Sequence, residues 1–206
     1  MDNRRLTTGQ VSLIGLALGV ACYLVAEWFT PKNVGSPGEH DVLLAIRLGL
    51  IYVPMVGLCV GWLQNSWRRA AVGAAVGVLI GVLYWVLSVS GNFLAIMVGF
   101  PCLLGGLFAA LVGSNRDEWV KGLGRRFGKG LLAGLVLGFV YMLVLNVVAG
   151  MLAQPYTSPA DYTDGYIRTM WRAGPVALGL ASALFVVLLR WAIGLSRVRL
   201  VVFEDA

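Results

Sequence analysis

The sequence predicts an all-α polytopic membrane protein, a bundle of six transmembrane helices with cytoplasmic N- and C-termini. Hydrophobic residues make up 59% of the 206 residues and charged residues only 13%, whereas soluble domains carry about 25% charged residues. The apolar residues fall in six blocks of about 20, the length that crosses a hydrocarbon core as a helix. The basic residues between these blocks are distributed unequally, as the positive-inside rule describes.

The six predicted spans leave no room for a separate soluble domain, so residues 1–206 are expected to form a single transmembrane domain. We place the spans at residues 8–29, 43–63, 71–90, 93–113, 131–151 and 175–195. If the spans alternate in direction, one side of the membrane receives most of the basic residues: Arg4, Arg5, Arg68, Arg69, Arg116, Lys121, Arg125, Arg126, Lys129, Arg190, Arg197 and Arg199. The opposite side receives Lys32, Arg47, Arg168 and Arg172.

This asymmetry predicts a multi-pass protein of a prokaryotic inner or plasma membrane, with the basic side in the cytoplasm. The net charge of +6 is then accounted for by contact with anionic lipid, and no nucleic-acid partner is expected.

The first span follows the basic segment MDNRR, which also suits a signal peptide. Its apolar stretch exceeds the usual length of about 7–15 residues, and no clear small-x-small cleavage site follows, so we expect a retained helix. The loop from Pro31 to Asp41 is predicted to form turns because of its Pro and Gly content. Its His40, with two adjacent acidic residues, is a poor ligand set, so no metal site is predicted.

The third and fifth spans repeat one pattern. RRAAVGAAVGVLIGVLY, residues 68–84, and RRFGKGLLAGLVLGFVY, residues 125–141, both carry an Arg pair, three glycines four residues apart and a Tyr. The Arg pairs suit an anchor at the cytoplasmic headgroups. Tyr84 and Tyr141 would lie at mid-membrane depth, where a hydroxyl needs a partner, so we expect both to face the bundle interior.

Glycines at intervals of four form a groove along one helix face, and small residues let membrane helices approach closely. The predicted packing or partner-interface residues are Gly15, Gly19, Gly73, Gly77, Gly81, Gly130, Gly134 and Gly138. Such grooves pack helices within one bundle or face another subunit. A membrane-protein partner or a homo-oligomer is therefore expected as an alternative to internal packing.

The second, fourth and sixth spans each contain a Pro followed by a Gly: Pro54 with Gly57, Pro101 with Gly105, and Pro175 with Gly179. Three repeated helical hairpins would explain this pattern, as in transporter folds with internal repeats. Gly-rich composition alone is the other explanation.

Polar residues within the spans gather toward the outer side, and the outer loop from Ala153 to Gly174 adds aromatic and charged residues. Intramembrane polar residues are candidate sites because they are costly. An outward-facing pocket would collect polar and aromatic residues from the spans and from this loop: Glu27, Trp28, Arg47, Tyr52, Asn92, Asn146, Tyr156, Asp161, Tyr162, Asp164, Tyr166, Arg168, Trp171 and Arg172. The alternative is that Glu27 pairs with Arg47 as a structural bridge while the aromatic residues anchor the membrane interface.

No motif indicates catalysis. Cys22, Cys59 and Cys102 are scattered within spans without CxxC spacing, which favours small apolar fillers over a metal or redox role. No Ser-His-Asp set or phosphate-binding glycine loop is present. We expect neither an enzyme nor a cofactor.

Residues 46–81, IRLGLIYVPMVGLCVGWLQNSWRRAAVGAAVGVLIG, resemble the second and third helices of substrate-binding S-components of energy-coupling-factor transporters. Asn146, Arg168 and Pro175 extend the similarity. The resemblance implies a small-molecule site near the outer surface and a coupling subunit that contacts Gly15, Gly19 and Gly77. It also implies that the substrate-binding residues, near the ligand, are Arg47, Asn92, Asn146, Tyr156, Arg168 and Trp171.

The sequence thus favours a membrane-embedded solute-binding or transport subunit with an outward-facing small-molecule site and a partner that supplies energy. The alternative is a structural or pore-forming subunit that oligomerises, or docks in a larger membrane complex, through its glycine-rich helix faces.

Overall fold

The computed structural model describes residues 7–31, 36–63, 67–89, 98–111, 122–152 and 159–193. These residues form six α-helices: α1 (Thr8–Trp28), α2 (Pro37–Leu63), α3 (Trp67–Val89), α4 (Phe100–Leu111), α5 (Leu123–Leu152) and α6 (Pro159–Ile193). No strand occurs among them. The predicted all-helical class is therefore confirmed for the described part of the chain.

Five of the described helices, all except α4, are long and apolar enough to cross a membrane. Helix α4 has 12 residues, fewer than the roughly 20 that a hydrocarbon core requires. Part of the predicted fourth span, 93–113, lies outside the described residues. Large apolar side chains point away from the bundle: Leu79, Phe139 and Met151 are 72%, 66% and 80% exposed. Such a surface suits contact with lipid.

Local hydrogen bonds set the starts of α1 and α2. Thr7 and Gln10 form a capping box, in which each side chain accepts from the backbone N–H of the other. The Ser36 hydroxyl accepts from the Glu39 backbone N–H at 3.3 Å, and Pro37 occupies the first helical position, where no N–H is needed. The expected turn at residues 37–41 is therefore wrong, because these residues form the beginning of α2.

Helices α5 and α6 begin well before the apolar spans predict. Helix α5 starts at Leu123 and not at residue 131, so Arg125 and Arg126 are helical and not in a loop. Helix α6 starts at Pro159 and not at residue 175, so much of the predicted outer loop is helix. The spans mark only the hydrocarbon-facing length, and long basic or amphipathic side chains let a helix continue into the headgroup region.

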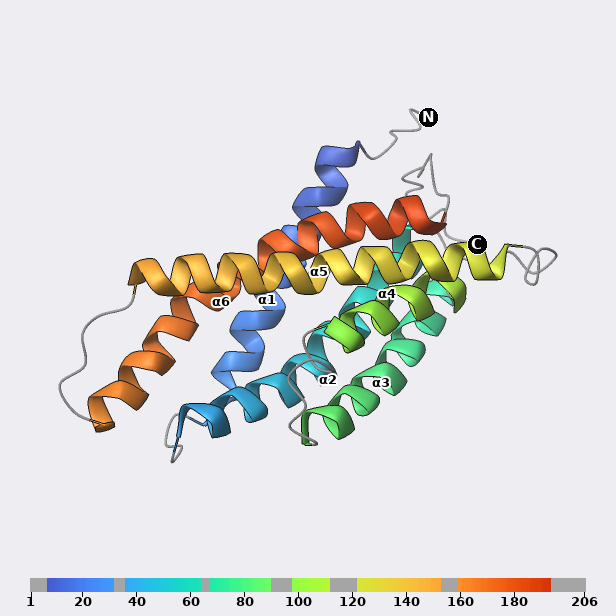
Figure 1. Cartoon of the computed structure of the whole chain (residues 1–206). Helices are drawn as coiled ribbons and strands as arrows, with labels where there is room; N and C mark the ends of the chain where they lie inside the picture. The colour runs from blue at the N-terminus through green and yellow to red at the C-terminus, as the bar shows by residue number, and fades with distance from the viewer. Residues whose placement is uncertain are drawn as a thin grey trace.

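Pro175 lies inside α6 and does not open it. Figure 1 shows α6 changing direction between its orange first part and its red second part. A proline removes one backbone hydrogen bond and bends a helix, which membrane helices tolerate where neighbours pack against the bend. The ring of Tyr23 provides such a neighbour, because it fills the space that a Cβ at Gly174 would occupy.

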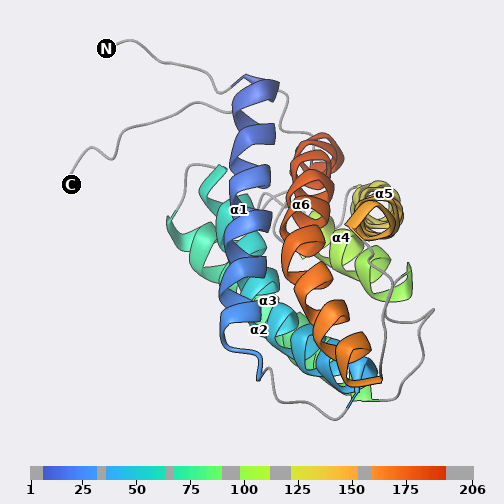
Figure 2. The ribbon, with the colours of Figure 1, turned by 90° about the vertical axis from the view of Figure 1, so that its left-hand side faces the viewer.

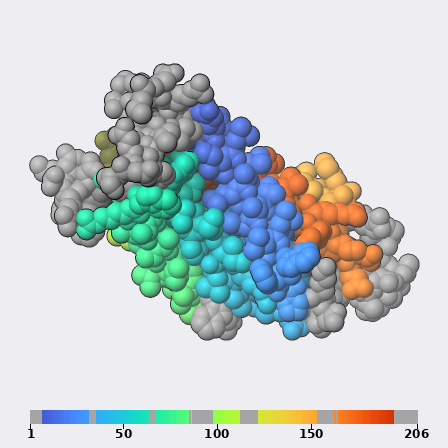
Figure 3. Space-filling model, turned by 180° about the vertical axis from the view of Figure 1, so that it is seen from behind, coloured from blue at the N-terminus to red at the C-terminus, as the bar shows by residue number. Residues whose placement is uncertain are grey.

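The helices are arranged as a ring in chain order. Each helix contacts the next one along the chain, and α6 closes the ring against α1. Figure 2 shows α1 and α6 side by side, and Figure 3 shows α1, α2 and α3 together on one face. Helix α6 also contacts α2 and α4 across the ring. The buried core follows these contacts, with Tyr23, Phe108 and Phe185 among its largest fully buried side chains.

Glycines lie where neighbouring helices approach most closely. At the α2–α3 contact, Gly57 faces Gly73, and Gly49 faces Gly81. A Cβ at Gly77 would lie 2.5 Å from Pro54 Cα, a separation that real Cβ atoms do not adopt. Close backbone approach of this kind needs a residue without a side chain.

The same relation holds at two other helix pairs. A Cβ at Gly15 would lie 2.6 Å from the Ser182 carbonyl oxygen, and one at Gly19 would meet the Leu178 carbonyl, both on α6. On α5, Gly130 faces Gly105 of α4, and Gly134 faces the carbonyl of Pro101. Gly15 and Gly19 of α1, Gly73, Gly77 and Gly81 of α3, and Gly130 and Gly134 of α5 therefore contact other helices of the same chain.

Candidate functional site

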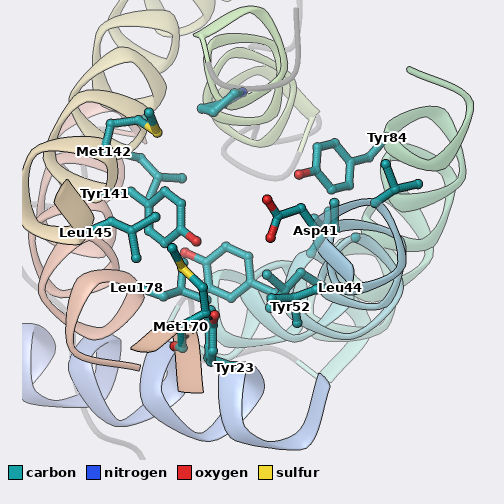
Figure 4. A pocket seen from close by; sticks show the side chains of 18 of the residues that line it. Tyr23, Asp41, Leu44, Tyr52, Tyr84, Tyr141, Met142, Leu145, Met170 and Leu178 are labelled. Carbon is teal, nitrogen blue, oxygen red and sulfur yellow. Dashed lines mark hydrogen bonds between the residues drawn. The ribbon is translucent and has the colours of Figure 1, made fainter. Parts of the chain in front are cut away.

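A cavity of about 550 Å³ lies inside the helix ring. Volumes of about 300–1,000 Å³ are usual for small-molecule sites. Figure 4 shows side chains from several helices converging on this space. Its lining residues are Tyr23 of α1; Asp41, Val42, Leu44, Ala45, Leu48, Gly49, Tyr52 and Val53 of α2; Tyr84 of α3; Pro101 of α4; Leu137, Gly138, Tyr141, Met142, Leu145, Asn146 and Ala149 of α5; and Tyr166, Met170 and Leu178 of α6.

Polar groups gather at one end of the cavity, which we call the mouth. The mouth comprises Asp41 near the start of α2, Asn146 near the end of α5, and Tyr166 near the start of α6. The Asp41 side chain is 49% exposed, so the cavity is accessible here. Tyr166 donates its hydroxyl hydrogen bond to Asp41 Oδ2 at 2.7 Å. Asn146 Nδ2 donates to the Met142 carbonyl at 2.7 Å.

A buried pair lies behind the mouth. His40 Nε2 is 3.1 Å from Glu27 Oε1, and both side chains are buried. On the other side of the His40 imidazole, Nδ1 lies 3.7 Å from Asp41 Oδ1, a distance too long for a hydrogen bond. This arrangement places an imidazole between a buried carboxylate and the carboxylate at the mouth.

Deeper in the cavity, tyrosine hydroxyls bond to the surrounding helices. Tyr52 Oη and Ser182 Oγ lie 2.8 Å apart in a buried hydrogen bond between α2 and α6. Tyr23 donates to the Met170 carbonyl at 3.2 Å. These bonds satisfy the hydroxyl groups, and the aromatic rings are left to line the space.

Tyr84 and Tyr141 line the cavity, as the sequence predicts from their depth in the third and fifth spans. Their ring planes and hydroxyls are visible on opposite sides of the space in Figure 4, with the Asp41 carboxylate directed between them. The ring of Tyr84 is packed against Phe100, with 4.1 Å between centroids and 36° between planes. Phe100 therefore supports Tyr84 from α4.

The predicted substrate-binding residues separate in the structure. Asn146 lines the cavity, whereas Arg47, Arg168 and Trp171 are not among its lining residues. Arg47 donates to the Leu43 carbonyl and Arg168 to the Asp164 carbonyl, each one turn earlier in its own helix. The other two predicted residues, Asn92 and Tyr156, lie outside the described residues. The structure does not bring Arg47 and Arg168 together with Asn146 around one space.

The predicted bridge between Glu27 and Arg47 is wrong, because Glu27 pairs with His40. Helix α2 begins at Pro37 and so brings His40 level with the end of α1. Arg47 lies about two turns deeper at 3.6 residues per turn.

Of the predicted glycines, Gly138 lines the cavity, and the other seven have backbone or side-chain atoms of the same chain beside them. No cluster of three or more His, Cys, Asp or Glu side chains that could hold a metal ion occurs within the described ranges.

Several lining residues were not predicted as site residues. Asp41 is the charged residue of the mouth. The sequence predicts a turn at this position, and a turn does not indicate where Asp41 lies relative to α5 and α6. Among the lining tyrosines, the sequence does not predict Tyr23, and it predicts Tyr52 and Tyr166 only within the wider set of residues that an outward-facing pocket would collect. A signal for Tyr23 is present in the sequence, because this residue lies within the first predicted span and a tyrosine hydroxyl there needs a partner.

Comparison with models of protein families, with curated proteins and with solved structures finds no match for the chain. The fold and site define an apolar, membrane-type helical bundle around a cavity.

Proposed function

We propose that this protein is a membrane-embedded solute-binding or transport subunit that holds a small molecule in the cavity between its helices. The observation that carries the proposal is the space of about 550 Å³ with polar groups at its accessible end and mostly apolar side chains along its depth. A protein with a purely structural role has no need of such a space, because close packing of its helices is more stable than an empty cavity.

The mouth faces outward in the predicted orientation. The positive-inside distribution places the start of α2, the end of α5 and the start of α6 on the outer side of a prokaryotic inner or plasma membrane. These are the segments that contribute Asp41, Asn146 and Tyr166. A six-span bundle with cytoplasmic termini is thus part of the proposal, as is uptake from the outer side.

An energy-supplying partner completes the proposal. The sequence has no phosphate-binding glycine loop, and its resemblance to S-components of energy-coupling-factor transporters implies a separate coupling subunit. We propose no chemical step for this chain, and its role is to bind and present the solute.

The experiment measures thermal stabilisation of the purified protein across vitamins, amino acids, nucleosides and amines. At least one compound should raise the melting temperature, because a ligand that binds only the folded state stabilises it. Leu145→Trp would place a bulky ring in the cavity, and the matched control Leu143→Trp changes an exposed position on the same helix. Stabilisation should disappear in Leu145→Trp and persist in Leu143→Trp. Failure of every compound to stabilise the native protein would overturn the proposal.

The alternative function is a structural or pore-forming subunit that oligomerises or docks through glycine-rich faces. Close intramolecular contacts at Gly15, Gly73 and Gly134 reduce the support for it, since these positions face helices of the same chain. Native mass measurement in mild detergent distinguishes the two. A stable oligomer together with an unresponsive cavity would favour the alternative.

A further inference from the structure

We infer that the cavity takes an organic cation, with its ammonium-type group at Asp41 and its apolar body among the tyrosine rings. This inference rests on the proposed function and specifies the chemical class of the solute. It follows from the charge of the lining, the arrangement of the rings, the lack of a metal-type ligand set in the described residues, and the apolar depth of the cavity.

The lining residues carry one charged side chain, Asp41, and include neither Lys nor Arg. The carboxylate is held by the hydroxyl of Tyr166 at 2.7 Å from Oδ2 and points into the cavity in Figure 4. An anionic solute would meet this carboxylate without a basic lining residue to balance its own charge, which disfavours it. A cation would gain the opposite charge of this half-exposed carboxylate, which lies 3.7 Å from His40 Nδ1, and the apolar lining beside it makes the interaction stronger than in bulk water.

Five tyrosines line the same space: Tyr23, Tyr52, Tyr84, Tyr141 and Tyr166. The faces of aromatic rings attract cations, and sets of such rings recognise quaternary ammonium groups. The hydroxyls of Tyr23, Tyr52 and Tyr166 bond to protein groups. Their rings are consequently held in place, which lowers the entropic cost of binding.

An inorganic ion fits the site less well. Divalent ions take about six or more oxygen ligands or a set of nitrogen and sulfur ligands. The cavity offers one carboxylate, and the described residues contain no cluster of three potential metal ligands. A single carboxylate beside aromatic rings instead matches a bulky monovalent group that needs little coordination.

The depth of the cavity defines the rest of the solute. Below the mouth, the lining includes Leu48, Val53, Leu137 and Leu178, with Met142 and Met170 on the neighbouring helices α5 and α6. Methionine side chains adapt to irregular apolar shapes. The solute class is therefore an amphipathic amine or quaternary ammonium compound with an aryl or branched alkyl body.

The test compares three probes of similar shape in neutral detergent: benzyltrimethylammonium, its uncharged carbon analogue neopentylbenzene, and the anion phenylmethanesulfonate. Affinity is taken from the concentration dependence of the melting temperature. The cation should bind at least about tenfold more tightly than either other probe. Asp41→Asn keeps the size of the side chain and should weaken cation binding by about tenfold or more. Asp164→Asn, an exposed α6 residue outside the lining, should leave it unchanged.

A second pair of variants covers the case in which Asp41→Asn does not fold. Tyr141→Phe keeps a ring face and should bind the cation nearly as well as the native protein. Tyr141→Leu removes the ring and should weaken binding by about threefold or more. Equal affinities in the two Tyr141 variants would count against the aromatic contribution.

The outcomes separate this inference from the proposed function. Tighter binding of the neutral or anionic probe, or an affinity that Asp41→Asn leaves unchanged, overturns the cation assignment while a solute-binding cavity stands. If the cation fails to bind while another compound of the wider library stabilises the protein through the cavity, the cation assignment alone fails. If nothing binds, both fail.

Discussion

Glu27 near the end of α1 and His40 near the start of α2 form a buried hydrogen-bonded pair, with 3.1 Å between Oε1 and Nε2. Glu27 Oε2 and His40 Nδ1 have no hydrogen-bond partner within the described part of the chain. The pair connects the first two helices directly behind the carboxylate of Asp41. It therefore couples the stability of this end of the ring to the geometry of the mouth.

We predict that Glu27→Ala and His40→Ala each destabilise the protein by about 3–5 kcal/mol, because each leaves a buried polar partner uncompensated. The double variant should cost less than the sum of the single variants. Thermal or denaturant unfolding in detergent measures the three values. Asp164→Ala, at an exposed position on α6, is the control and should change little. Additive effects of the two substitutions would contradict direct coupling.

The contact between α2 and α3 leads to a second prediction. A Cβ at Gly73 would overlap the carbonyl of Gly57, so Gly73→Ala should destabilise the protein by about 1–3 kcal/mol through overpacking. Gly128→Ala is the matched control, because no atom lies within 4 Å of the added Cβ. It should be neutral or stabilise α5 by up to about 1 kcal/mol. Comparable unfolding temperatures for the two variants would show that α2 and α3 do not approach this closely.

The buried hydrogen bond between Tyr52 and Ser182 leads to a third prediction. Tyr52→Phe leaves the Ser182 hydroxyl unsatisfied, and Ser182→Ala leaves the Tyr52 hydroxyl unsatisfied, so each should cost about 1–3 kcal/mol. The double variant should cost little more than either single variant, since both polar groups are then removed. A double-mutant cycle on unfolding free energies checks this. Absence of coupling would mean that the two hydroxyls find other partners.

The helical class of the described residues was predictable because apolar length and charge position depend only on local sequence. Helix ends were less predictable. The span near residues 175–195 captures the apolar second part of α6, but its amphipathic first part, from Pro159, has too many polar residues to be recognised as a span. The thickness of the hydrocarbon core sets the length of the apolar block, but the helix itself can extend beyond that core.

The candidate site was predicted only in part, for a related reason. Depth along a span can be counted in residues, so Tyr84 and Tyr141 were expected inside the bundle, where they line the cavity. The rotation of a helix about its axis depends on its neighbours, so the sequence does not show that Arg47 lies outside the cavity lining. Predicting Asp41 as a lining residue requires both its depth along the helix and the rotation of that helix about its axis. Neither can be counted from the apolar span, because α2 begins at Pro37, before the span.

The last prediction concerns the direction of the mouth, which decides whether the solute enters from outside the cell. The positive-inside rule predicts that the start of α6 lies outside and the start of α5 in the cytoplasm. In a background with Cys22, Cys59 and Cys102 replaced by Ala, Asp164→Cys and Arg125→Cys each supply one thiol at an exposed position.

A membrane-impermeant maleimide should label Asp164→Cys in intact cells and Arg125→Cys only after permeabilisation. The cysteine-free protein is the control and should not react under either condition. The reverse pattern would direct the mouth to the cytoplasm and make export the relevant direction. Labelling of both variants in intact cells would indicate that the chain inserts in two orientations, which the unequal distribution of its basic residues argues against.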